Sequence, residues 1–165
     1  MSVSLLRTNA AIEDCERHLE STESYGTEIE SYLTQHILVL FCAEIQQEIY
    51  KMLNERASFS GDEGIRQFVA ASAPMILRSV QKDHLANLAA LFGQDAKEQF
   101  NSMLDDKDVT SYNNAVRDRH DVAHKHGAQV SFEEVRKAVE SAIRILESLR
   151  MVIYLSVAGS HKAST

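Results

Sequence analysis

The chain has 165 residues, with 24 acidic and 17 basic side chains, one proline, six glycines, two cysteines and no tryptophan. This length suits one compact domain whose core needs no disulfide or metal, and the scarcity of proline and glycine argues against a turn-rich β-sandwich. A formal net charge of −7 excludes a protein that coats nucleic acid through many phosphate contacts. We therefore expect an all-α domain, and any contact with RNA or DNA must be local.

Apolar residues recur at three- and four-residue steps along most of the chain, which predicts an antiparallel bundle of long and short helices. The expected helices cover residues 4–20, 27–56, two or three stretches within 63–93, 94–104, and a segment that follows the acidic connection 105–108. Pro74 is expected at a helix start or break. Cys15 and Cys42 form no metal or disulfide pattern, and no leader or membrane-length apolar stretch occurs, so a cytoplasmic protein is expected.

The last long helix is predicted to begin at a capping box, because Ser131 precedes Glu134 by three residues. An apolar seam follows, with the spacing of coiled-coil contact positions: Phe132, Val135, Val139, Ala142, Leu146, Leu149 and Ile153. Such a seam either packs inside a bundle or forms a dimer face, and the sequence leaves both possibilities open. Residues 1–158 are expected to form a single domain, and residues 159–165 a flexible polar tail.

Chemically active side chains are densest between Val109 and Gly127, where three histidines and two arginines fall within ten residues. On a helical wheel, Arg119 and His124 flank a packed stripe around Val116. The side chains expected to point away from that stripe are Asp118, Asp121 and Lys125. Gly127 suits a helix C-cap, which would place His124 and His126 in the last turn, where the helix dipole favours cations.

Three interpretations of this cluster compete, and two of them, a structural role in the last helical turn and a zinc site, follow from the residue types alone. Arginine and histidine in a last turn commonly bind terminal carbonyls or pair with neighbouring aspartates. A zinc site from His120, His124 and His126 lacks the intervening glutamate and an obvious further ligand, so no metal is expected. A carboxylate from Glu44 or Glu48 on the long second helix could orient the motif arginine, although a solvent-facing position is favoured for both.

The third interpretation comes from a resemblance. The string Arg119-His120-Asp121-Val122-Ala123-His124, followed by Lys125-His126-Gly127, resembles the motif of the HEPN superfamily of small helical bundles. The resemblance implies metal-independent RNA cleavage at a site that two motifs form across a homodimer. Arg119 would bind phosphate, His124 would transfer protons, and His120 would position or polarise in place of the common asparagine.

The resemblance also implies the partners of the protein. Arg117, Lys125 and His126 would add weaker RNA contacts, so that two copies of the motif make a basic cleft on an acidic protein. The expected role is a toxin or defence effector, with RNA as substrate, a possible antitoxin or regulatory protein, no cofactor and no membrane. The alternatives are a non-catalytic HEPN module for RNA, nucleotide or protein binding, and a plain helical dimerisation module.

Overall fold

The computed structural model describes residues 3–122 and 130–160, with side chains over 3–119 and 130–154, and within these ranges the chain forms seven helices and no strand. Their bounds are α1 Leu6–Thr22, α2 Glu28–Ser58, α3 Glu63–Ile76, α4 Lys82–Ala90, α5 Gln94–Ser102, α6 Asp106–Val122 and α7 Phe132–Ser160. The predicted all-α class is confirmed. No helix in the described ranges is long and apolar enough to cross a membrane.

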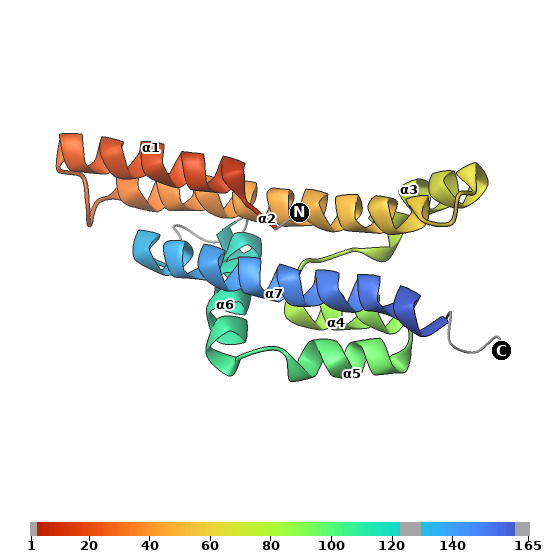
Figure 1. The fold of residues 1–165 in the computed structure, drawn as a ribbon. Coiled ribbons are helices and arrows are strands. Elements are labelled where there is room, and N and C mark those ends of the chain that lie inside the picture. Colours follow the sequence, from red (N-terminus) through yellow and green to blue (C-terminus); the bar gives the residue numbers. More distant parts are fainter. Residues whose placement is uncertain (1–2, 123–129, 161–165) are drawn as a thin grey trace.

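The two longest helices, α2 and α7, organise the bundle. α1 and α2 form an antiparallel hairpin, α7 runs beside α2, and α6 lies steeply across both (Figure 1). α4 and α5 form a short hairpin against α7, and α3 packs against the C-terminal part of α2. α6 therefore contacts α2 on one side and α7 on another, which determines how its side chains are distributed.

Local sequence explains several of the helix boundaries. The Thr27 hydroxyl accepts a hydrogen bond from Ile29 N at 3.2 Å at the start of α2, and the Asp62 carboxylate caps α3. Asp105 accepts from Lys107 N at 2.7 Å, so α6 already begins at Asp106. The predicted connection 105–108 was therefore three residues too long, because its acidic residues belong to the first helical turn.

Pro74 lies inside α3, two residues before the helix ends at Ile76. The prediction of a helix start at Pro74 is thus wrong. The prediction of a helix break misses the observed end of α3 by two residues. A proline this close to the C-terminus removes one backbone donor while the remaining turn still closes, since Leu77 N donates to Ala73 O at 3.0 Å. The chain leaves the helix immediately afterwards, toward the connection between α3 and α4.

The predicted capping box at the start of α7 is present. Ser131 N donates to the Glu134 carboxylate at 2.8 Å, and Glu134 N donates back to the Ser131 hydroxyl at 3.3 Å. All seven residues of the predicted α7 seam are buried within the protomer. The seam is therefore bundle interior and is not available as a dimer face. α7 extends to Ser160, two residues into the expected tail, and residues 161–165 lie outside the described ranges.

Candidate functional site

Arg119 lies on the exposed edge of α6 and lines a small cavity of about 100 Å³ between α6, α2 and the connection from α3 to α4. Tyr112 and Val116, which belong to the packed stripe that Arg119 flanks, are fully buried in the core. The lining residues are Val39, Cys42, Ala43 and Gln46 of α2, Arg78, Ser79 and Val80 of the connection, and Val116 and Arg119 of α6. The motif arginine thus opens to solvent beside a packed surface.

A second arginine, Arg78, faces the same cavity from the connection between α3 and α4. This connection is held on α6 at two points. The buried hydroxyl of Tyr112 donates to the carbonyl of Val80, and Lys82 N donates to the side-chain oxygen of Asn113 at 3.1 Å. Because both anchors belong to α6, the backbone beside Arg78 is fixed to the helix that carries Arg119.

The electrostatics of the cavity oppose those of the whole chain. Two arginine residues line it and none of its described lining residues is acidic, although acidic residues outnumber basic ones in the sequence. Burial raises the pKa of the Cys42 thiol to about 11, and the positive charge of Arg119 lowers it by a smaller amount. The thiol is therefore neutral at pH 7, so the wall adds no negative charge to oppose an anion.

Asp118, the neighbour of Arg119, does point away from the stripe around Val116, but it is buried, because α6 packs against other helices on more than one side. Its carboxylate accepts a hydrogen bond from Val130 N at 3.1 Å. The contact links the motif helix to the residues that lead into α7. An aspartate that looked solvent-facing on a single-helix wheel is thus a tertiary contact.

The other predicted site residues are only partly placed. Arg117 is exposed on α6 and does not line the Arg119 cavity. The backbone of His120 lies in α6, whereas its side chain and the whole of His124, Lys125, His126 and Gly127 lie outside the described parts of the chain. Within those parts, no three His, Cys, Asp or Glu side chains gather as metal ligands.

Glu44 caps the N-terminus of α1, so the expected solvent-facing position is wrong for this residue. Its carboxylate is buried and accepts hydrogen bonds from Arg7 N at 2.9 Å, Thr8 N at 2.7 Å and the Thr8 hydroxyl at 2.6 Å. It is therefore committed to α1 rather than to Arg119. Glu48 is partly exposed and pairs loosely with Lys51 at 3.9 Å.

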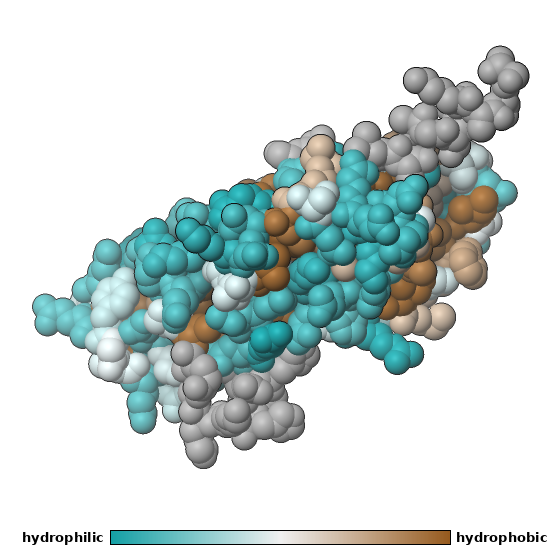
Figure 2. Space-filling view, turned by 90° about the horizontal axis from the view of Figure 1, so that it is seen from below, coloured by the Kyte–Doolittle hydropathy of each residue, from teal (hydrophilic) through white to brown (hydrophobic). Residues whose placement is uncertain are grey.

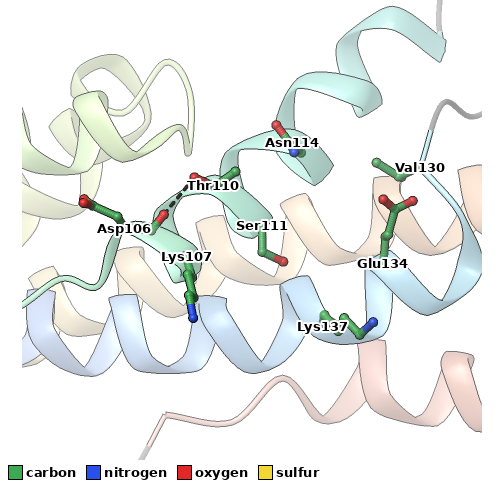
Figure 3. Close-up of a pocket in the computed structure, with 8 residues that line it drawn as sticks. All are labelled: Asp106, Lys107, Thr110, Ser111, Asn114, Val130, Glu134 and Lys137. Atoms are coloured by element: carbon green, nitrogen blue, oxygen red, sulfur yellow. Dashed lines mark hydrogen bonds between the residues drawn. The ribbon is translucent and has the colours of Figure 1, made fainter.

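The cavity drawn in Figure 3 lies between α6 and α7 and measures about 400 Å³. It is lined by Asp106, Lys107, Thr110, Ser111, Asn114, Val130, Glu134 and Lys137. Its lining contains both acidic and basic side chains. Two of its polar groups already have partners, since the Thr110 hydroxyl donates to Asp106 O at 2.8 Å and the Glu134 carboxylate accepts from Ser131 in the capping box. Thr110 lies about 180° from Arg119 around α6, so this cavity does not extend the arginine site.

An apolar groove of about 250 Å³ lies between the end of α2, α3 and α4. Phe68 and Leu91, 71% and 65% exposed, lie along it, and Figure 2 shows apolar side chains reaching the surface at this end of the molecule. None of the motif residues that the structure describes lines it. Sequence patterns missed Arg78 altogether, since it follows an ordinary helix end and belongs to no motif.

Comparison with known proteins yields one match. A family model described as RiboL-PSP-HEPN matches residues 4–154, a range that runs from α1 to near the end of α7 and includes both cavity arginines. No curated protein and no solved structure matches the chain.

Proposed function

The chain belongs to the HEPN family described as RiboL-PSP-HEPN, and on that premise we propose that it is a metal-independent endoribonuclease. Family membership supports a nuclease or RNA-binding module in general. The observation that carries the finer proposal is the position of Arg119, which is exposed and lines a cavity that is also lined by Arg78 and by no acidic residue among those described. An arginine retained only for structure would instead be expected beneath neighbouring helices.

The residues of the motif suit cleavage by the ribose 2′-hydroxyl. Arg119 binds a non-bridging phosphate oxygen and stabilises the charge that develops at phosphorus. His124 takes the proton from the 2′-hydroxyl or gives one to the leaving 5′-oxygen, since imidazole titrates near neutrality, and His120 positions or polarises. A bond forms from the 2′-oxygen to phosphorus as the bond to the 5′-oxygen breaks. The products are a 2′,3′-cyclic phosphate and a 5′-hydroxyl.

We place the complete site in a homodimer, where two motifs face one RNA strand. One protomer supplies one Arg119 and a small cationic cavity, and a second copy doubles the local positive charge on an acidic protein. Because the α7 seam is internal, another surface makes the contact between protomers. The biological role proposed is that of a toxin or defence effector, restrained by an antitoxin or regulatory protein that covers the cleft.

The test is cleavage of mixed RNA by the purified protein in EDTA, compared with Arg119→Ala and His124→Ala. Both variants are expected to lose activity by at least about a hundredfold, which is the usual scale for a general acid or base or an electrostatic stabiliser. Arg66→Ala is the matched control, because Arg66 is exposed and pairs with Glu63 on α3. Loss of wild-type activity in EDTA, or variants as active as the parent, would contradict the mechanism.

The second candidate is a non-catalytic HEPN module that binds RNA through the same arginine cavity. The same purified protein distinguishes the two functions. Binding without cleavage that depends on Arg119 would select the binding module. Sedimentation as a monomer at micromolar concentration would count separately against the composite site.

A further inference from the structure

Arg78 lies outside the motif and 41 positions before Arg119 in the sequence, yet the fold brings both to one cavity. We propose that Arg78 is a second phosphate-binding residue, and that Arg78 and Arg119 bind one phosphodiester group of RNA between them. The inference rests on the proposed RNA-directed function and adds to it a substrate-binding residue that the motif does not contain.

The position of Arg78 is built into the bundle. On either side of Arg78 and Ser79, the chain is anchored by the buried side chains of Leu77 and Val80. Tyr112 and Asn113, about two helical turns before Arg119, hold the same connection through the Val80 carbonyl and Lys82 N. The two arginine side chains therefore extend from backbones that are fixed to each other, so both can reach a single ligand in the cavity without a movement of the backbone.

The charge of the site selects an anion. The positive charges of Arg78 and Arg119, which both line this cavity, repel each other, and none of the described lining residues is a carboxylate that could neutralise them. An anion placed between them relieves that repulsion. Guanidinium groups present planar pairs of donors that match phosphate oxygens, so a phosphodiester is a better partner than a small halide.

The size and the remaining polar groups of the cavity narrow the ligand further. A volume of about 100 Å³ is well below the roughly 300–1,000 Å³ of sites that enclose drug-sized ligands. A cavity of this size suits a single phosphate group. The Ser79 hydroxyl accepts from Gln81 N at 3.2 Å, which leaves its own proton free to donate.

The remaining walls strengthen the interaction. Val39, Ala43 and Val116 are apolar, and the Cys42 thiol is neutral at pH 7. An ionic hydrogen bond beside such walls is stronger than one in bulk water, because less solvent screens it. The Gln46 amide donates one of its two protons to the Tyr50 hydroxyl at 2.5 Å, which leaves the other for the ligand.

The test measures binding of a single-stranded 2′-O-methyl oligoribonucleotide, which the proposed reaction cannot cleave, by fluorescence anisotropy at several salt concentrations. Arg78→Gln is expected to weaken binding about tenfold and to reduce the salt slope by about 0.7, the contribution of one phosphate contact in a single strand. Arg78→Lys keeps the charge without the planar donor pair, so an intermediate loss is expected. Arg66→Gln is the matched control and should bind as the wild type does.

A double variant tests whether the two arginines share one phosphate. The combined loss of Arg78→Gln and Arg119→Gln is expected to be smaller than the product of the single losses, because either change alone already disrupts the shared ligand. Independent losses, or Arg78→Gln binding with wild-type affinity and slope, would overturn the inference. Far-UV circular dichroism checks that each variant is folded.

Failure of the inference can be told apart from failure of the proposed function. If the wild type cleaves RNA in EDTA while Arg78→Gln binds and cleaves normally, Arg78 is not a phosphate ligand and the ribonuclease proposal stands. If the wild type fails to cleave but the binding pattern above is found, the phosphate site stands and the catalytic proposal fails.

Discussion

The carboxylate of Asp118 accepts a hydrogen bond from the backbone N–H of Val130 at 3.1 Å, and Asp118 is only 4% exposed. The contact joins α6 to the residue two positions before α7 begins. In the sequence, His124 lies between these two residues. The hydrogen bond therefore fixes the two flanks of the segment that carries the proposed proton-transfer group.

We predict that Asp118→Ala lowers the free energy of unfolding by about 2 kcal/mol, because it removes a buried acceptor and leaves Val130 N–H without this partner. Asp118→Asn keeps an oxygen in place and should cost less. Urea unfolding followed by circular dichroism measures both. RNA cleavage should fall in the same order, and wild-type stability of Asp118→Ala would refute the structural role given to this contact.

Tyr112→Phe is predicted to weaken RNA binding although Tyr112 touches no ligand. The change deletes the buried hydroxyl that donates to the Val80 carbonyl, which should cost about 1–2 kcal/mol of stability and loosen the connection that carries Arg78. Under steady-state conditions we expect KM for RNA to rise more than kcat falls. A folded variant with an unchanged KM would show that the connection does not position Arg78.

Tyr154→Phe is the matched control for that experiment. The Tyr154 hydroxyl donates to the Glu55 carboxylate at 2.7 Å, away from the arginine cavity. Its loss should also lower stability, by up to about 1–2 kcal/mol, and leave RNA binding unchanged.

Glu44→Gln should detach the N-terminus of α1. The carboxylate accepts from two backbone N–H groups and one hydroxyl, whereas a glutamine side chain brings its own N–H₂ donors to face these groups. We expect a loss of about 2 kcal/mol in the free energy of unfolding and faster hydrogen exchange in α1. Glu48→Gln on the same helix, which only loosens a partly exposed ion pair, should stay within about 0.5 kcal/mol of the wild type.

The Asp108–Arg144 pair makes stability depend on pH. Arg144 donates to both carboxylate oxygens of Asp108 at 2.6 and 2.7 Å, and this hydrogen bonding holds the pKa of Asp108 below its ordinary value, with help from Ser141. A lowered folded pKa stabilises the protein above the unfolded pKa of about 3.9, and the contribution is lost as pH falls through the folded value. The pair therefore favours the folded state at neutral pH.

Asp108→Asn should accordingly cost about 1 kcal/mol at pH 7, a figure kept low because Arg144 is largely exposed, and the gap from the wild type should close below about pH 4. Thermal melts at pH 7, 5 and 3.5 measure the gap. Asp106→Asn in the same helical turn serves as the control, and a gap that grows on acidification would contradict the assignment.

Periodicity was a good guide to the helices and to the core. The order of the helices, the Ser131–Glu134 cap and the α7 seam depend on residues close in sequence, so local patterns predict them. The same patterns placed Glu44 in solvent, because the α1 donors that bind it lie 36 and 37 positions away and leave no trace in the spacing of apolar residues.

In the candidate site, too, sequence patterns predicted one residue and missed another. Arg119 stands out because neighbouring histidines and an alanine complete a recognisable string. Arg78 has no such neighbours, and only the contact of its connection with Tyr112 and Asn113 places it beside Arg119. Patterns along one helix likewise cannot reveal that Asp118 is buried, since its burial depends on how α6 packs against the rest of the chain.

The internal position of the α7 seam separates folding from assembly. Each protomer completes its hydrophobic core with its own residues, so the separated protomer should stay folded when a dimer is diluted below its dissociation constant. A dimer joined through another surface would obey mass action independently. Dilution would then switch the proposed nuclease off by separating folded halves of its site, and concentration would restore it without refolding.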